Sequence, residues 1–191
     1  MINTLQFENG CFYHIYNRGN NSGIIFKEDA NFLYFLILLK KHISPIAEIY
    51  TYCLLNNHFH LLIKIKENED NKVKYEQSFS NLFNAYAKAY NKKYNRTGKL
   101  FEERFKKIKI DDEFYLTELI YYIHANPQKH GILKDFRDYK YSSYNTIISS
   151  KPTVLSRDEV IKWFGGLSFF IEYHLDRHVK LSYDKLAEFD I

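Results

Sequence analysis

Hydrophobic and polar residues alternate with a period of two between residues 58 and 66. The apolar positions share one parity: Phe59, Leu61, Ile63 and Ile65. This alternation predicts a strand with one packed face, and it places His58 and His60 together on the other face. Their backbone positions are about 7 Å apart, so both imidazoles can lean onto one divalent ion. The alternative is a strand whose open face carries two ordinary histidines.

The remaining pattern predicts a small α+β domain. Period-two or apolar, aromatic-rich stretches indicate strands over 11–17, 46–55, 58–66 and 105–110, and helical periodicity indicates helices over 29–42 and 78–94. The resulting order, β-α-β-β-α-β, is that of ferredoxin-like folds. We therefore expect both helices on one sheet face, with the first and third strands side by side in the centre.

A third helix is predicted from about residue 112 until Pro127, which cannot continue a helix. Its apolar stripe consists of Leu116, Leu119, Ile120 and Ile123. Tyr115, Tyr122 and Asn126 lie along one edge of this stripe, and Tyr121 points nearly the opposite way. The stripe must dock on the sheet face that the first two helices leave open, which would bring Tyr122 towards the histidine pair. Without further information, the simpler interpretation of Tyr122 is an aromatic residue at a helix boundary.

Beyond Asp138 the pattern weakens. A short helix is expected over 156–163 and a last helix from about Ser168. His174 and His178 in the last helix have the i, i+4 spacing of a metal site, but no acidic or thiol partner accompanies them, so we interpret them as surface histidines. We divide the chain into a domain over 1–145 and a helical C-terminal extension over 146–191 whose role the pattern does not indicate.

Composition adds two constraints. The chain has 191 residues, 46% of them hydrophobic, so it can bury a core of its own, and its net charge of +4 permits a nucleic-acid partner. Its 17 Tyr and 16 Phe residues are suited to stacking on unpaired bases, although an AT-rich genome produces the same bias.

The expected location is the cytoplasm. Only Cys11 and Cys53 are present, too few for a disulfide framework. The first residues lack a basic and an apolar signal region, and the longest apolar run, Phe32 to Leu39, is too short to span a membrane. We expect no membrane partner.

Four segments together resemble one family. They are Tyr13-His14-Ile15-Tyr16-Asn17-Arg18-Gly19-Asn20, Asn57-His58-Phe59-His60-Leu61-Leu62, Arg96-Thr97-Gly98-Lys99-Leu100-Phe101-Glu102-Glu103-Arg104-Phe105-Lys106 and Tyr122-Ile123-His124-Ala125-Asn126-Pro127. Over about Gly10 to Tyr144 the chain is similar to the single-tyrosine HUH transposases, and in particular to the REP-associated tyrosine transposases. The segment from about Lys151 has no such counterpart.

The resemblance implies a ferredoxin-like domain that cleaves and rejoins single-stranded DNA at hairpin-bearing, REP-like sites. It implies that Tyr122 is the nucleophile, forming a 5′-phosphotyrosine, and that His58, His60 and Asn126 bind Mg²⁺ or Mn²⁺. A homodimer is possible. Two other classes stay open, namely a hairpin-binding module without catalysis and a metal-dependent hydrolase that uses activated water.

Basic residues near these segments are candidates for DNA binding. Lys107 and Lys109 have the parity opposite to Ile108 and Ile110, so we expect the lysines on the open sheet face and the isoleucines in the core. Further candidates at element ends and in loops are Arg18, Arg96, Lys99, Arg104 and Lys106. Each of them is as easily an ordinary solvated side chain. We also expect His14 beside the histidine pair, supporting it without binding the metal.

Overall fold

A four-stranded antiparallel sheet is the centre of the computed structural model, which describes residues 6–68, 74–112 and 114–179. Its strands are β1 (Phe12–Arg18), β2 (Ala47–Leu54), β3 (His58–Ile65) and β4 (Lys106–Ile110), in the spatial order β2-β3-β1-β4. β1 and β3 are therefore the central pair, as predicted. A short 3₁₀ helix, η1 (Asn20–Ser22), follows β1.

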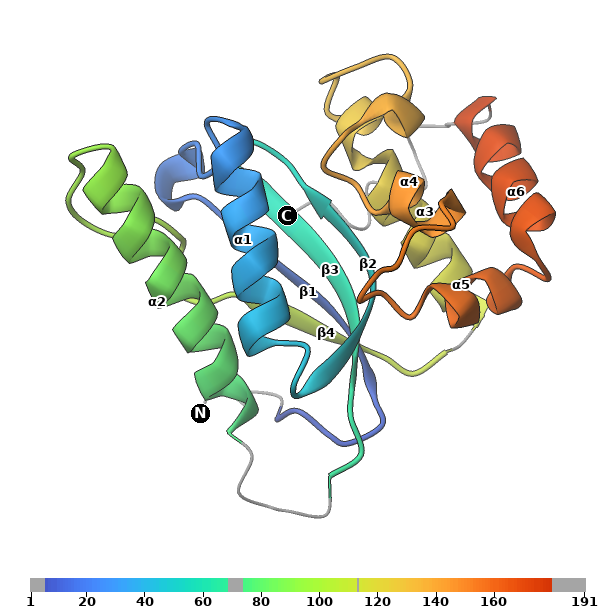
Figure 1. Cartoon of the computed structure of the whole chain (residues 1–191), viewed down its shortest axis with the longest axis horizontal. Coiled ribbons are helices and arrows are strands. Elements are labelled where there is room, and N and C mark those ends of the chain that lie inside the picture. Colours follow the sequence, from blue (N-terminus) through green and yellow to red (C-terminus); the bar gives the residue numbers. More distant parts are fainter. Residues whose placement is uncertain (1–5, 69–73, 113, 180–191) are drawn as a thin grey trace.

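Two helices cover one face of this sheet, α1 (Asp29–His42) and α2 (Tyr75–Lys93) (Figure 1). The apolar side chains of β3 face these two helices. The centre of the Phe59 ring lies 5.1 Å from that of Phe35 in α1 and 5.7 Å from that of Phe83 in α2. The start of α1 is stabilised by a reciprocal capping box between Glu28 and Asn31. The element order and the placement of both helices confirm the fold predicted from the sequence.

The third helix, α3 (Phe114–Lys129), packs on the opposite face, mainly against β2 and also against β3. Its predicted stripe is buried throughout. The predicted end at Pro127 was wrong, because the helix continues to Lys129. A proline inside a helix removes its own N–H donor and crowds the carbonyl four residues earlier, but it leaves the amides that follow it free to bond. The His130 amide accordingly donates to the Asn126 carbonyl at 2.9 Å.

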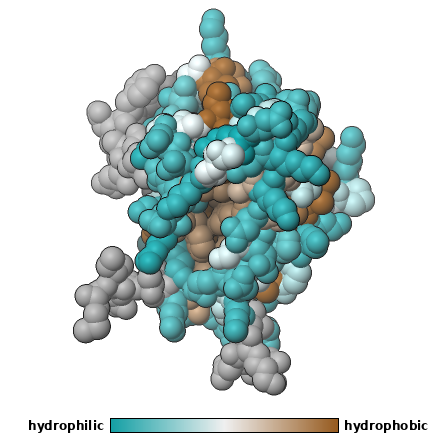
Figure 2. Space-filling model, turned by 90° about the vertical axis from the view of Figure 1, so that its left-hand side faces the viewer, coloured by the Kyte–Doolittle hydropathy of each residue, from teal (hydrophilic) through white to brown (hydrophobic). Residues whose placement is uncertain are grey.

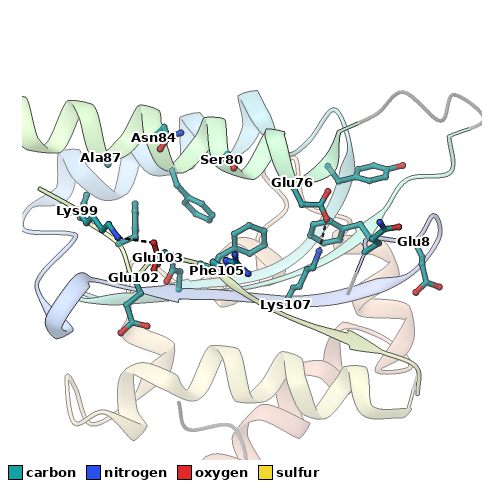
Figure 3. Close-up of a pocket in the computed structure, with 18 of the residues that line it drawn as sticks. Glu8, Glu76, Ser80, Asn84, Ala87, Lys99, Glu102, Glu103, Phe105 and Lys107 are labelled. Carbon is teal, nitrogen blue, oxygen red and sulfur yellow. Dashed lines mark hydrogen bonds and ion pairs between the residues drawn. The ribbon is translucent and has the colours of Figure 1, made fainter. Parts of the chain in front are cut away.

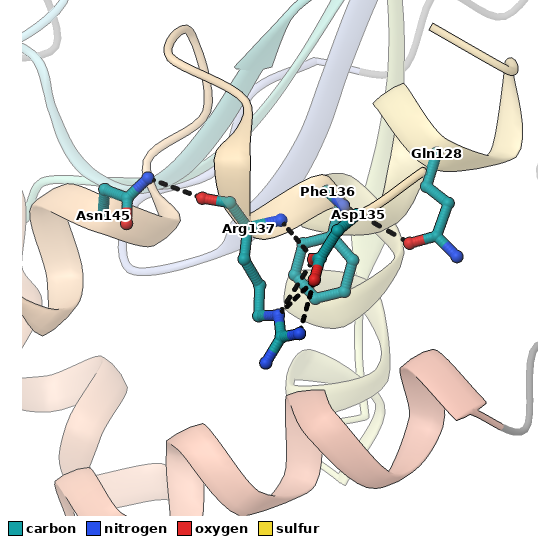
Figure 4. A network of polar contacts seen from close by, with 5 residues as sticks. All are labelled: Gln128, Asp135, Phe136, Arg137 and Asn145. Atoms are coloured by element: carbon teal, nitrogen blue, oxygen red, sulfur yellow. Dashed lines mark hydrogen bonds and ion pairs between the residues drawn. The ribbon is translucent and has the colours of Figure 1, made fainter. Parts of the chain in front are cut away.

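The connection after α3 returns to the edge of β2 through a 3₁₀ helix, η2 (Phe136–Asp138). Figure 4 shows how side chains hold this connection. The Phe136 amide donates to Gln128 Oε1 at 3.3 Å, Arg137 pairs with Asp135, and Asn145 Nδ2 donates to the Arg137 carbonyl at 2.7 Å. These contacts fix the segment that leads to Ser142 and Ser143 beside β2.

Three more helices complete the described chain, α4 (Tyr144–Ile148), α5 (Arg157–Trp163) and α6 (Leu167–Val179). Trp163 stacks on Tyr50 of β2 with ring centres 4.8 Å apart and meets Phe12 of β1 edge-on at 5.5 Å. α6 lies beside α3 (Figure 1). The C-terminal extension therefore packs against the sheet and α3. No helix in the described part of the chain is long and apolar enough to cross a membrane.

The interpretation of His174 as a surface residue was wrong. It is fully buried between α6 and α3, with its Nε2 atom 3.0 Å from Nδ1 of His124. Spacing alone could not show this, because burial depends on which helix α6 packs against. The His178 side chain lies outside the described part of the structure.

The buried histidine pair predicts an acid-sensitive stability. Burial lowers the pKa of His174 to about 3, and it lowers the pKa of His124 well below its usual value. Below about pH 6.5 the unfolded chain therefore binds more protons than the folded chain does. For each of the two histidines, the free energy of unfolding falls by up to about 1.4 kcal/mol for every pH unit below that value.

Urea unfolding between roughly pH 7 and pH 5 tests this. His174→Gln should show a shallower pH dependence than the wild type, whatever its absolute stability. Parallel curves for the two proteins would contradict the prediction.

Candidate active site

Three histidines gather on the sheet face that α3 covers. Strand pairing places His60 opposite Tyr16 and His58 opposite Arg18, so β1 and β3 share this face. His14 Nε2 and His60 Nδ1 lie 3.0 Å apart, and both residues are buried. The predicted position of His14 beside the histidine pair is confirmed, since its ring lies on this face and not beneath α1.

Neighbouring side chains orient both rings of the predicted metal pair. Asn57 Oδ1 lies 2.7 Å from His58 Nδ1, and an amide oxygen only accepts, so Nδ1 of His58 carries the proton. His60 Nδ1 is engaged by His14. In both rings Nδ1 is thus bonded to protein, which makes Nε2 the atom that would bind a ligand.

Burial keeps the imidazoles of His14 and His60 neutral. It lowers the pKa of His14 to about 3, and the pKa of His60 lies well below the usual value, first because of burial and then because His14, His58, His130 and Lys129 are close. A neutral imidazole has a nitrogen lone pair available, which metal binding requires.

Tyr122 lies against the histidines. Its ring centre is 5.6 Å from His60 and 6.3 Å from His14, in both cases edge-to-face, and the side chain is only 1% exposed. Tyr121 points away, with its ring 5.7 Å from His174 and 6.0 Å from Phe136. The docking of α3 predicted from its apolar stripe is confirmed, and it places the Tyr122 ring, not the Tyr121 ring, beside the histidines.

Asn126 follows Tyr122 by one helical turn. Its Nδ2 donates to the Tyr122 carbonyl at 2.9 Å, and the residue is fully buried. Its Oδ1 has no hydrogen-bond partner within the described chain. A buried acceptor without a partner is costly, and a cation or a polar ligand would satisfy it.

The residues present fit a divalent ion held by two imidazole nitrogens and one amide oxygen. Among the described residues, no group of three or more His, Cys, Asp or Glu side chains is arranged to hold a metal. A site here therefore depends on the Asn126 oxygen joining His58 and His60. Such a mixed donor set suits Mn²⁺ better than Mg²⁺, because Mg²⁺ prefers oxygen ligands.

Sequence reasoning missed two residues of this site. Lys129 Nζ lies 5.3 Å from the centre of the Tyr122 ring, and the His130 ring lies 4.7 Å from that of His58. Lys129 is the last residue of α3 and His130 follows it directly, whereas the helix was predicted to stop earlier. The spacing of Tyr122, Asn126 and His130, four residues apart in turn, was the signal that could have found the histidine.

The predicted faces of β4 were wrong. Lys107 is paired with Ile15 of β1, and Lys109 with Tyr13, so both lysines point to the side that α1 and α2 cover. Ile108 lies opposite His14 on the site face and is 45% exposed. The assumption that apolar residues face the core failed because β4 is an edge strand.

Local contacts stabilise this reversed orientation of β4. Lys107 Nζ pairs with Glu76 of α2 at 2.8 Å and lies 3.9 Å from the centre of the Phe7 ring, and Lys109 pairs with Glu8 at 2.8 Å. A long lysine stem can thus cover aromatic rings while its ammonium group remains paired at the edge.

The other basic candidates divide between two places. Arg18 and Lys106 lie on the site face, since Arg18 is opposite His58 and Lys106 is opposite Tyr16. Lys99 and Arg104, with Lys107, line an open groove of about 1440 Å³ between α2 and the residue 98–107 segment (Figure 3). Arg96 bonds within its own loop, to Asn91 and the Lys99 carbonyl.

Acidic and apolar residues share this groove, which makes it a poor phosphate site. Glu8, Glu76, Glu102 and Glu103 line it together with Phe83, Phe101 and Phe105. A hollow with an apolar floor framed by hydrophilic side chains is visible on the side of the molecule that bears α2 (Figure 2). The groove lies across the sheet from α3 and its tyrosine.

Comparison with known proteins points to the family that the sequence resembles. A Haemophilus influenzae protein provisionally named a REP-associated tyrosine transposase is 31% identical over 106 residues, which cover 52% of this chain and 60% of that protein. The chain resembles the REP-associated tyrosine transposases. The resemblance predicted from the sequence is thereby confirmed, although the match spans less than two thirds of the relative. No family model matches the chain.

One solved structure has the same fold. The structure of a REP-associated tyrosine transposase bound to a REP hairpin superimposes with a TM-score of 0.60 at 17% identity, over 80% of this chain and 89% of that one. A crystal structure described as a transposase of Deinococcus radiodurans gives a TM-score of 0.41 at 11% identity, over 63% of this chain and 95% of that one.

The orientation of His58 leads to a test of the metal site. Asn57→Ala removes the acceptor that holds the His58 proton on Nδ1, so we expect about 10- to 100-fold weaker Mn²⁺ binding by isothermal titration calorimetry. Asn56→Ala is the matched control, because Asn56 is exposed and its hydrogen bonds to Ile25 and Phe26 use its backbone carbonyl. Equal affinities for both variants would contradict the assignment.

Proposed function

We propose that this chain is a metal-dependent, single-stranded DNA transposase of the HUH nuclease type. It cleaves and rejoins DNA at hairpin-bearing sites through a 5′-phosphotyrosine on Tyr122. The observation that carries the proposal is the contact of the Tyr122 ring with His60 and His14 across the α3–sheet interface. The resemblance to REP-associated tyrosine transposases supports it independently.

His58, His60 and Asn126 would hold the divalent ion. When bound, a divalent cation polarises the scissile phosphate and neutralises the charge that develops on its oxygens. The chain contributes two imidazoles whose Nδ1 atoms are engaged by Asn57 and His14, together with a buried amide oxygen that has no other partner among the described residues.

Tyr122 supplies the nucleophile. Its phenolic oxygen forms a bond to phosphorus while the bond from phosphorus to the 3′ oxygen breaks, leaving a 5′-phosphotyrosine and a free 3′-hydroxyl. The covalent link keeps the energy of the broken bond, so the reverse attack by a 3′-hydroxyl rejoins DNA without ATP. The ammonium group of Lys129 lies over the Tyr122 ring, where its charge favours both the phenolate and the phosphate.

The exposed part of the site face offers a path for the DNA strand. Lys106 is exposed, and Ile108 lies beside it on the same face of β4. Tyr16 is half-buried, and the centre of its ring lies 5.9 Å from the centre of the His60 ring. A cation for the backbone and flat or apolar surfaces for bases are the elements of a single-strand site. A related structure that holds a REP hairpin supports DNA of this kind as the substrate.

The first test concerns the nucleophile. Tyr122→Phe should abolish the covalent protein–DNA adduct on single-stranded hairpin DNA in a denaturing gel, and hairpin binding should remain nearly intact. Tyr121→Phe is the matched control and should form the adduct at close to the wild-type rate, because Tyr121 points towards α6. Replacing both His58 and His60 by Ala should remove metal-dependent cleavage.

The outcomes separate the competing functions. Cleavage by Tyr122→Phe without an adduct would indicate a hydrolase that uses activated water. Hairpin binding by the wild type, with neither an adduct nor cleavage in Mn²⁺, would indicate a binding module.

The second test concerns the DNA path. Lys106→Ala should lower the dependence of the binding constant on salt by about 0.7 in the logarithmic slope, because each phosphate contact releases counterions. Lys107→Ala, one residue along β4, should leave the slope unchanged, since Lys107 pairs with Glu76 across the sheet. The reverse result in a salt titration would place the DNA in the groove beneath α2.

A further inference from the structure

A closed cluster of buried polar side chains joins α3 to β2 and α6. His124 of α3 is at its centre, with Nε2 2.7 Å from Thr51 Oγ1 and 2.8 Å from Ser143 Oγ, and with Nδ1 3.0 Å from Nε2 of His174. The two hydroxyls lie 2.7 Å from each other. All four residues are fully buried.

The direction of the hydrogen bonds at the two histidines follows from one fixed acceptor. The Phe170 carbonyl lies 2.8 Å from His174 Nδ1, so that nitrogen carries a proton and His174 Nε2 must accept. His124 Nδ1 therefore donates to His174, and its Nε2 accepts a hydroxyl proton from Thr51 of β2 or from Ser143, which precedes α4. Ser143 Oγ in turn accepts from the Tyr52 amide at 2.9 Å. A single pair of tautomers satisfies every nitrogen.

Apolar packing alone defines the rotation of α3 poorly. Every residue from 119 to 127 is buried, so this part of the helix has no solvent-facing side to specify its orientation. Tyr121 and Tyr122 are adjacent and both buried, and a rotation of about 100° would exchange them. The Tyr121 hydroxyl has no hydrogen-bond partner in the described chain, so it does not hold the helix in place.

His124 supplies the directional constraint. Two residues along a helix correspond to about 200°, so His124 and Tyr122 lie on nearly opposite sides of α3. Hydrogen bonds that hold His124 on β2 therefore also set the direction of Tyr122. Without an acceptor at His174, the Nδ1 proton of His124 would be buried and unsatisfied, which favours a different rotation or a displaced helix.

We propose that α6 is a positioning element of the active site: His174 orients His124, and the His124 hydrogen bonds fix the rotation of α3 that turns Tyr122 rather than Tyr121 towards His60. This assigns a role to the C-terminal extension. The catalytic consequence rests on the function proposed above, whereas the orientation of Tyr122 does not.

The test uses the full chain labelled with 3-fluorotyrosine, with the ¹⁹F signals of Tyr121 and Tyr122 assigned by their Tyr→Phe variants. His174→Leu removes the acceptor, and we expect the Tyr122 signal to move or split. His174→Gln restores an acceptor oxygen and should restore the wild-type signal. Phe170→Leu, a buried substitution one turn earlier in α6, disturbs packing without removing the acceptor side chain and should leave the Tyr122 signal in place.

A second variant covers the case in which His174→Leu does not fold. Thr51→Val with Ser143→Ala breaks the other end of the cluster and leaves α6 intact, and it should displace the Tyr122 signal in the same way. An unchanged signal in either folded variant would overturn the proposal. An equal displacement by Phe170→Leu would also overturn it, because packing would then be sufficient.

Adduct formation provides the catalytic readout. His174→Leu should form the adduct about 100-fold more slowly, as expected for a reacting group displaced by about 1 Å, while its affinity for hairpin DNA is unchanged. His174→Gln should recover most of the rate. If the wild type forms no adduct but the ¹⁹F signals respond as expected, the proposed function fails and the positioning role of α6 stands.

Discussion

The docking of α3 on the second face of the sheet is the interaction on which the candidate site depends. His58, His60 and His14 belong to the sheet, whereas Tyr122 and Asn126 belong to the helix, so neither part holds a complete set of groups. Burial of the leucine and isoleucine stripe against β2 and β3 brings the two together. Each fully buried side chain of this kind stabilises the contact by about 1.5–3 kcal/mol. The relative position of the two halves of the site therefore depends on ordinary core packing.

Burial also determines the chemistry of the polar groups at this interface. The low dielectric of the interior disfavours charged imidazoles, and the pKa values of His14, His60, His124 and His174 are all lowered for this reason. Neutral rings can act as donor at one nitrogen and acceptor at the other. The same physical effect thus keeps both histidine groups neutral, and in the His124–His174 group it allows a directed set of hydrogen bonds.

Charge is distributed differently on the two sides of the sheet. On the side of α1 and α2, Lys107 and Lys109 pair with Glu76 and Glu8, so the charges of these two lysines are largely neutralised. On the site face, Lys106 is exposed and Lys129 lies over the tyrosine ring. A net charge of +4 therefore says less about a DNA path than the face on which each lysine lies.

Periodicity in the sequence was sufficient for the order of elements, the packed face of β3, the shared face of His58 and His60, and the edge of α3 that carries Tyr122. These features depend on local backbone geometry, which repeats every 2 residues in a strand and about every 3.6 in a helix. The spacing of apolar residues in the sequence follows the same repeats. The orientation of β4 was not predictable in this way, because a strand at the sheet edge can place either parity inwards and its partners Glu76 and Glu8 are distant in sequence. The burial of His174 and the approach of Lys129 and His130 to the site were likewise decided by tertiary structure. Each depends on which surfaces meet, and that is a property of the packed fold and not of any single segment.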